Sequence, residues 1–191
     1  MAAGGPSSTR LYTRTGDRGE TGLAGGVRVA KDAPRIRAFG SYDEVGAHLG
    51  LTLARLEPGA QPFRATLDRL QHETFILQAE LASAPTGTPP AHRIEDRHVL
   101  RLEQEIDQYT AMVDPMRSFV LPRGNAAGAQ LHVARTVARR AERELWTLNR
   151  MEPVAPPALQ WANRLGDLLY AMALALNRYQ GFVDTPPDYT V

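Results

Sequence analysis

The chain has 191 residues, 43% of them hydrophobic and 23% charged, which is the composition of an ordinary globular domain. The formal net charge is +1, so the protein lacks the general basic field of a nucleic-acid-binding domain, and any anion binding must be local. The absence of cysteine excludes disulfides, thiol nucleophiles, iron–sulfur ligation and cysteine-ligated zinc. If the chemistry requires electrons, another protein must deliver them.

Both ends of the sequence are interpreted as tails. Residues 1–10 lack the apolar segment of a secretory signal and are too few for a transit peptide, so a disordered tail is expected there. A second tail is expected at 181–191, after the last helical pattern. No stretch approaches the roughly 18 apolar residues of a membrane span. We therefore expect a cytoplasmic protein without membrane contact.

Residues 11–34 are rich in glycine, threonine and charge and show no sustained hydrophobic period, which predicts a long loop. Within it, the sequence TRTGDRGETG at 13–22 has glycines that let backbone amides turn inward, and Arg14, Arg18 and Lys31 add positive charge. Such a nest can cradle phosphate. It is not a Walker A loop, because no Gly-Lys-Ser/Thr sequence follows and no strand precedes it. An ordinary flexible loop is the alternative.

Five helical patterns follow, separated by proline and glycine, and they are expected at about 41–56, 62–83, 94–112, 125–150 and 158–179. The first is expected to begin with a capping box of Ser41 and Glu44. No strand signal is stronger than Phe119–Leu121. The sequence therefore predicts an all-α protein, with an antiparallel five-helix bundle over residues 35–180.

The fourth pattern has an apolar seam with spacings of three and four residues: Leu131, Ala134, Ala138, Ala141, Leu145 and Leu148. At about 100° per residue, Arg135, Arg139 and Glu142 share a flank beside this seam, with His132 and Trp146 nearby. A solvated face with charge pairs is one interpretation. Planar recognition of phosphate or carboxylate by arginine is the other.

The residues alone leave the roles of three further positions open. Asn163 and Asp167 lie away from the apolar seam of the fifth pattern, which runs from Trp161 to Tyr179, so they are either solvated or face a second chain. We favour the second chain. Phe119 lies in a connector bounded by proline and glycine, where a hydrophobic plug at one end of the bundle is the alternative to a functional role. The five histidines form no pair with metal spacing, and we expect them to be structural or solvated.

Three separated blocks, TRTGDRGETGL, ARTVARRAERE and NRLGDLLY, together resemble the PduO-type ATP:cob(I)alamin adenosyltransferases. The resemblance covers residues 11–180. It implies a ferritin-like, cobalamin adenosyltransferase-like five-helix bundle that assembles as a homotrimer, with active sites at the subunit interfaces. The loop 11–34 would be its phosphate-binding segment.

The resemblance also implies the residues of the site. One chain would cradle the ATP triphosphate with residues of the loop: Thr13, Arg14, Thr15, Gly16, Asp17, Thr21, Gly22 and Lys31. The neighbouring chain would complete the nucleotide site with Arg139, Arg140, Glu142, Arg143 and Asn163. Asp43 and Arg135 match an inter-subunit ion pair of the family, and Phe119 matches the aromatic residue beneath the corrin. Arg123 stands where the family commonly has glycine, which leaves the corrin contacts open.

The implied activity is transfer of the 5′-deoxyadenosyl group of ATP to the cobalt of cob(I)alamin, giving adenosylcobalamin and triphosphate. Mg²⁺ is expected with the ATP, and no residue is assigned as a metal ligand. An external reductase and an acceptor enzyme dependent on adenosylcobalamin are the expected partners. The alternatives are a non-catalytic trimeric interaction protein and another ATP-binding transferase. Nucleic-acid binding is the least favoured, because no basic and aromatic residues interleave.

Overall fold

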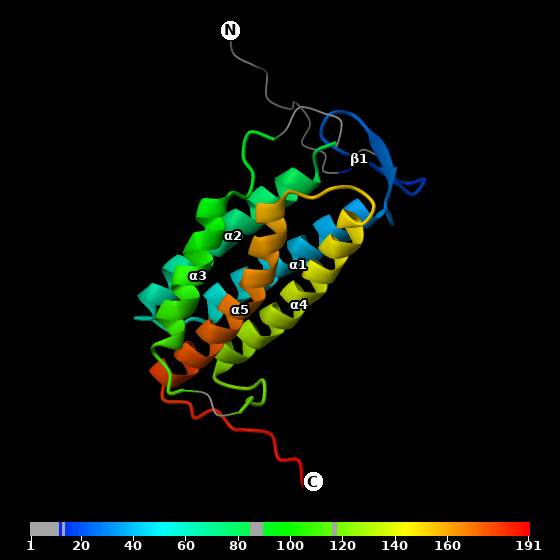
Figure 1. The fold of residues 1–191 in the computed structure, drawn as a ribbon. Coiled ribbons are helices and arrows are strands. Elements are labelled where there is room, and N and C mark those ends of the chain that lie inside the picture. Colours follow the sequence, from blue (N-terminus) through cyan, green and yellow to red (C-terminus); the bar gives the residue numbers. More distant parts are fainter. Residues whose placement is uncertain (1–11, 13, 85–89, 116–117) are drawn as a thin grey trace.

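The computed structural model describes residues 12, 14–84, 90–115 and 118–191, and five helices lie within them (Figure 1). The elements in chain order are β1 (Glu20–Gly22), β2 (Arg28–Ala30), α1 (Pro34–Arg55), α2 (Gln61–Leu81), α3 (Asp96–Thr110), α4 (Ala126–Asn149) and α5 (Pro156–Tyr179). Helix α1 packs against α2 and α4, and α5 packs against α3 and α4. The predicted helical bundle is confirmed.

Prolines begin two of the helices. Helix α1 starts at Pro34, well before the expected start at Ser41, and α5 starts at Pro156. Proline suits the first turn because its φ is already helical and the missing N–H has no partner there. The expected capping box is wrong, since Ser41 lies buried inside α1. The other three helices begin and end within two residues of their predicted bounds.

The segment expected to be all loop contains a short hairpin. Strand β1 pairs antiparallel with β2, with Thr21 opposite Val29. The turn between them uses Gly25 and Gly26 at φ 95° and 83°, a region that side chains other than glycine rarely adopt. Strands of three residues give no periodic signal, which explains the error. Residues 119–121 do not form a strand, although the Leu121 N–H donates to the Thr185 carbonyl (2.8 Å).

The predicted seam of α4 is confirmed, because all six of its residues are buried at the centre of the bundle. The seam of α5 is confirmed from Trp161 to Ala175, but Tyr179 is exposed and lies outside the core. The bundle has two distinct ends (Figure 1). The hairpin lies at one end, beside the start of α1 and the end of α4. The segment before α4 and the C-terminal segment lie at the other.

Candidate functional site

The hairpin places the Lys31 ammonium beside Gly16. The Lys31 N–H donates to the Gly19 carbonyl (2.8 Å), and Arg28 donates to the Thr15 carbonyl (2.8 Å). A Cβ added to Gly16 would lie 3.2 Å from the Lys31 Nζ, so a side chain there would press on the ammonium. Arg14 adopts a left-handed backbone conformation at φ 61°, which is uncommon outside glycine. The predicted phosphate nest is therefore an ordered turn with a cation held over it. Thr13 lies outside the described residues.

A buried arginine fixes the end of the bundle on which the hairpin rests. Arg35, at the start of α1, is 8% exposed. Its guanidinium donates to the carbonyls of Leu81 (3.0 Å) and Ser83 (3.3 Å) and pairs with Glu152 (2.7 Å). The hairpin attaches to the same place, since the Ala24 N–H donates to the Ala82 carbonyl (2.8 Å). We call Arg35 with its three partners the hairpin anchor.

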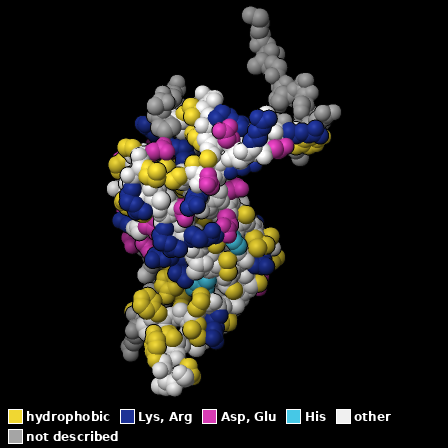
Figure 2. Space-filling view, turned by 90° about the vertical axis from the view of Figure 1, so that its right-hand side faces the viewer, with side chains coloured by type: hydrophobic (Ala, Val, Ile, Leu, Met, Phe, Trp, Pro, Cys, Tyr) yellow, Lys and Arg dark blue, Asp and Glu magenta, His cyan; other side chains and the backbone are white. Residues whose placement is uncertain are grey.

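Helices α4 and α5 together present the residues predicted to complete a nucleotide site. The Asn163 amide donates to the Glu142 carboxylate (3.1 Å), and a Cβ added to Gly166 would lie 3.3 Å from Cγ of Arg139. Arg139 and Arg143 are exposed. We call Arg139, Glu142, Arg143 and Asn163 the α4–α5 face. Figure 2 shows Lys and Arg side chains gathered across the middle of the side of the molecule that carries α4.

Arg140 lies on a different flank of α4. It forms an ion pair with Glu44 of α1, and both side chains are close to half exposed. The arginines that the resemblance assigns to the nucleotide site are therefore divided, with Arg140 on the α1 side of α4 and Arg139 on its α5 side.

Arg135 and His132 pack around Tyr170 of α5. The Arg135 guanidinium lies over the Tyr170 ring, 5.6 Å from its centre, and the His132 ring is 6.0 Å from the same ring. His132 is 2% exposed, which fits the structural alternative and excludes the solvated one. Burial lowers the pKa of His132, the Arg135 charge lowers it further, and Asp184 opposes both. Burial also raises the pKa of Tyr170. Sequence reasoning missed Tyr170, whose only signal was its place on the polar side of α5.

Asp43 lies on another side of the bundle. It borders an open groove of about 640 Å³ between α1 and α2, and it accepts a hydrogen bond from Gln78 (3.0 Å). Asp68 lines the same groove, and Phe75 lines it with a largely exposed ring. No contact among the described residues joins Asp43 to Arg135. The structure thus does not bring the two together within one chain.

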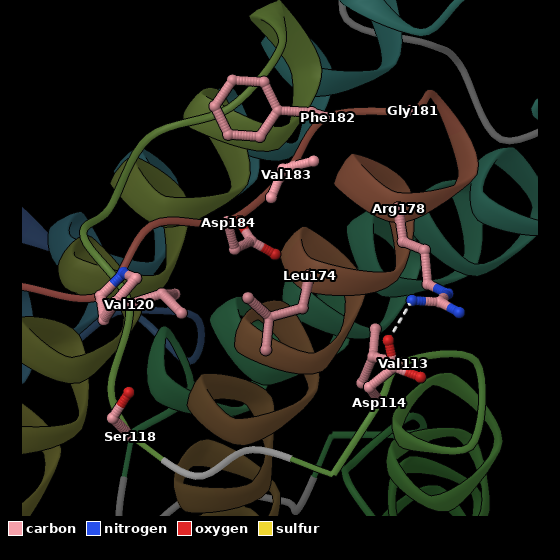
Figure 3. A pocket seen from close by; sticks show the side chains of 11 residues that line it. Val113, Asp114, Ser118, Val120, Leu174, Arg178, Gly181, Phe182, Val183 and Asp184 are labelled. Carbon is pink, nitrogen blue, oxygen red and sulfur yellow. Dashed lines mark hydrogen bonds and ion pairs between the residues drawn. The ribbon is translucent and has the colours of Figure 1, made fainter.

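Phe119 is 78% exposed, so the interpretation as a plug at the end of the bundle is wrong for the single chain. It lies in the segment 118–125, which we call the connector. A cavity of about 410 Å³ separates this connector from the C-terminal segment 181–186. Figure 3 shows Leu174 of α5 facing this cavity, with Ser118 and Val120 on one side and the Arg178–Asp114 ion pair on the other. Phe119 does not line the cavity, although both of its neighbours do.

The sequence matches the family model described as cobalamin adenosyltransferase over residues 11–176. The chain belongs to the cobalamin adenosyltransferase family. It is 38% identical to a corrinoid adenosyltransferase of Bacillus subtilis over 92% of this chain and 90% of the relative. It is 43% identical to one of Citrobacter freundii over 86% of this chain and 93% of the relative.

A solved structure of the same family has the same fold. It is a phenylalanine-to-alanine variant of a PduO-type ATP:corrinoid adenosyltransferase from Lactobacillus reuteri, complexed with cobalamin and ATP. Its TM-score to this chain is 0.87 at 31% identity, over 93% of this chain and 99% of that one. The resemblance inferred from three sequence blocks is therefore confirmed at the level of the family.

In this member of the cobalamin adenosyltransferase family, the predicted site residues form separate groups. The hairpin residues with Lys31 lie at one end, the α4–α5 face lies along the side, and Phe119 lies at the other end. No helix among the described residues is long and apolar enough to cross a membrane. Nor do three or more His, Asp or Glu side chains of the described residues gather where they could hold a metal ion.

Proposed function

We propose that this protein transfers the 5′-deoxyadenosyl group of ATP to the cobalt of cob(I)alamin and releases triphosphate. Membership of the family supports this activity, as does the likeness to a relative complexed with cobalamin and ATP. The observation that carries the proposal is the Lys31 ammonium held over the Gly16 turn, in a chain that also presents an exposed ring at Phe119. A non-catalytic interaction protein would leave the Lys31 arrangement without a role.

The reaction requires little acid–base chemistry from the protein. The electron pair of Co(I) attacks the 5′ carbon of ATP, the bond from that carbon to oxygen breaks, and its electrons leave with the triphosphate. Co(I) is a strong nucleophile, so no general base is required. The protein holds the two substrates in line and stabilises the negative charge of the leaving group. Lys31 and Arg139 are the cations that we assign to the triphosphate, with Arg14, Arg140 and Arg143 in support.

Mg²⁺ would share the charge of the triphosphate. The described residues contain no group of three or more acidic or histidine side chains that could bind a metal ion by themselves. This fits Mg²⁺ carried by the phosphate oxygens and water, which is how the ion is commonly bound with nucleotides. Lys31 and Arg139 would then orient the phosphates to which the ion is attached.

We assign Phe119 to the lower face of the corrin. An exposed ring is costly in water and is available to contact a large apolar ligand. Beneath cobalt it would exclude water or a base from the lower axial position, which favours four-coordinate Co(II) and makes it easier to reduce. An external reductase then supplies the electron, because the chain has no cysteine for iron–sulfur ligation or thiol redox chemistry.

The separation of the site residues supports an active site shared between chains of a homotrimer. Asp43 faces an open, acidic groove between α1 and α2, while Arg135 lies on the α5 side of α4. The Nε atom of Arg135 is buried without a hydrogen-bond partner among the described residues. A neighbouring chain that brings Asp43 to the Arg135 guanidinium would pair the two charges, and it would bring the α4–α5 face to the hairpin residues. We also place the enzyme in the cytoplasm, where a separate reductase can deliver electrons.

Anaerobic incubation with ATP, Mg²⁺ and chemically reduced cobalamin tests the activity. We expect the absorption spectrum of adenosylcobalamin to develop in proportion to enzyme, with triphosphate as the second product. A folded protein that gives no adenosylcobalamin under these conditions refutes the proposed function.

Mixing two variants with damaged ATP sites tests the shared site, at an ATP concentration where each variant alone is inactive. Lys31→Met damages the hairpin half, and Arg139→Ala damages the α4–α5 half. When the two variants are co-expressed, some interfaces combine two intact halves, so activity should reappear. The control is the double variant co-expressed with an inactive single variant, which forms no intact interface. If co-purified mixed oligomers stay inactive, the site lies within one chain.

A further inference from the structure

Asn177 is a polar residue directly after an apolar run of α5. The residues before it, 171–176, are all hydrophobic and buried, and Asn177 itself is fully buried. A buried amide is costly unless it is hydrogen-bonded, so its partners indicate why a polar side chain is present.

The partners of Asn177 lie on two other segments. Its Nδ2 donates to the Arg123 carbonyl of the connector (3.0 Å) and to the Asp184 carboxylate of the C-terminal segment (2.8 Å). Both partners are acceptors, which fixes the orientation of the amide. Its backbone carbonyl also accepts from the Phe182 N–H (2.8 Å). One residue therefore holds the connector and the C-terminal segment to α5.

Glycines make room for this amide. A Cβ added to either Gly124 or Gly128 would overlap the Asn177 side chain. Gly124 belongs to the connector and Gly128 to the first turn of α4. The amide therefore packs directly against the backbone of both, and its position sets how closely the connector approaches α5.

The cavity makes these hydrogen bonds more important. The connector residues Ser118 and Val120 face about 410 Å³ of open space, with Phe182 and Val183 on its other side. Where the connector borders this cavity, side-chain packing holds it less firmly, so the hydrogen bonds at its edges contribute more to its position. Those are the bond of Asn177 to Arg123, the Leu121–Thr185 backbone bond, and a bond between Tyr170 and the Val120 backbone.

We propose that Asn177 is a positioning residue for the corrin half of the reaction: its amide sets the connector, and hence the exposed Phe119 ring, relative to the C-terminal segment. The proposal rests on the proposed function, because it takes the Phe119 ring to contact the corrin. Asn177 itself touches neither substrate. It acts by holding the connector backbone in a position from which the Phe119 ring can lie beneath cobalt.

Asn177→Asp is the primary test, since it keeps the shape and replaces the donor with an acceptor. Two acceptors would then face the new carboxylate, so both side-chain bonds should be lost. We expect the KM for cobalamin to rise about tenfold or more, the scale of a lost charge-assisted hydrogen bond. The KM for ATP should stay within about twofold, because the hairpin is at the other end of the bundle. The four-coordinate Co(II) signal of the ATP complex should fall sharply.

Reversing the polarity of one bond provides a rescue. In the double variant Asn177→Asp with Asp184→Asn, the amide at 184 can donate to the carboxylate at 177. We expect a substantial part of the four-coordinate signal and of the cobalamin KM to return, although the bond to the Arg123 carbonyl stays broken. Asp184→Asn alone keeps an acceptor for Asn177 and should have a small effect. Asn149→Asp is the matched control, because Asn149 uses its oxygen to accept from the Val154 N–H (3.0 Å), and Asp can do the same.

The outcomes distinguish a failure of the proposed function from a failure of the positioning role of Asn177. If the wild type gives no adenosylcobalamin, the proposed function fails. If the wild type is active and Asn177→Asp keeps the cobalamin KM and the Co(II) signal, the positioning role of Asn177 is wrong. The same holds if both KM values rise together and the double variant restores neither, since a general loss of structure gives that result. Should Asn177→Asp not fold, Asn177→Ser, whose shorter side chain has one O–H and cannot reach both acceptors, must show the same selective effect on cobalamin.

Discussion

The two ends of the bundle are built on the same plan with different chemistry. At each end a buried side chain donates to backbone carbonyls and to one carboxylate: Arg35 to Leu81, Ser83 and Glu152 at the hairpin end, and Asn177 to Arg123 and Asp184 at the connector end. The hairpin end uses a cation, and its partner carboxylate is about one third exposed. The connector end uses a neutral amide that is fully buried.

The difference corresponds to what each end presents. The hairpin presents cations around a glycine turn, and a charged anchor near solvent is compatible with that surface. The connector carries one exposed apolar ring beside a cavity, where a buried unpaired charge would be expensive. Under the proposed function the hairpin binds polyphosphate and the connector contacts the corrin, and the two ends would fix their loops in different ways for that reason. The predictions below test whether the two ends are independent.

The largest effect is expected at Arg35. Arg35→Met leaves two carbonyls and the Glu152 carboxylate without their donor, and it should lower the free energy of unfolding by about 2–4 kcal/mol. The lower part of that range allows for the exposure of Glu152. Urea denaturation measures the loss. The control Arg37→Met, on the exposed side of the same helix, should change stability by less than about 0.5 kcal/mol. A loss below 1 kcal/mol at Arg35 would show that the anchor is dispensable.

The next largest effects are expected from one substitution at each end, each of which should affect only one substrate. Lys31→Met should weaken ATP binding by about 1.5–3 kcal/mol, the scale of a charge-assisted hydrogen bond, and leave cobalamin binding unchanged. Phe119→Ala should do the reverse: ATP titrates normally, while turnover from Co(II) falls more than turnover from preformed Co(I). Calorimetric titration and the Co(II) spectrum measure the two halves. If either variant weakens both substrates equally, the two ends do not act independently.

A smaller effect is expected from two glycine-to-alanine changes that differ only in location. Alanine is intrinsically better in a helix than glycine by about 1 kcal/mol. Gly40 in α1 is exposed and nothing lies within 4 Å of an added Cβ, so Gly40→Ala should stabilise the protein. Gly128→Ala would push on the Asn177 amide, and we expect a net loss of about 1–2 kcal/mol. Equal gains at both positions would mean that the Asn177 side chain moves aside freely.

The smallest effect concerns pH. The pKa of His132 is lowered in the folded protein, so below its ordinary value of 6.5 the unfolded chain binds more protons than the folded one. Stability from this group is therefore present above pH 6.5 and is lost as the pH falls below it. The slope is a fraction of the roughly 1.4 kcal/mol per pH unit of a full proton. His132→Phe should remove this component, which a comparison of denaturation midpoints at pH 7.5 and 5.5 would reveal. Parallel profiles for the two proteins would contradict it.

Sequence periodicity was sufficient to predict the helices and their buried seams, because a helix that packs on one side repeats its apolar residues every three or four positions. It also placed Asn163 and Glu142 on polar flanks, and the structure shows them hydrogen-bonded to each other. Family resemblance rather than periodicity supplied the pairing of Asp43 with Arg135. That pairing stays a prediction, as does the assignment of the nucleotide residues.

The two buried donors, Arg35 and Asn177, could not be predicted in the same way. Arg35 reaches Glu152 across 117 positions of sequence, and Asn177 reaches back 54 positions to Arg123. Each depends on how segments without a period meet in three dimensions. Asn177 follows six apolar residues near the end of a helix, where an asparagine is easily interpreted as part of the terminus. The hairpin could not be predicted for a related reason. Its three-residue strands are too short to show an alternation of polar and apolar residues.

The positions of the hairpin anchor and of the Asn177 contacts along the chain have a consequence for folding during synthesis. Every member of the hairpin anchor has been made once Glu152 is added, whereas Asn177 needs Asp184, 32 residues further along the chain. Chains are made and fold from the N-terminus onward. We therefore expect the hairpin end to mature before the connector end. A nascent chain with Glu152 outside the ribosome and Asp184 still inside it would then be protected from protease at the hairpin and still be cleaved in the connector.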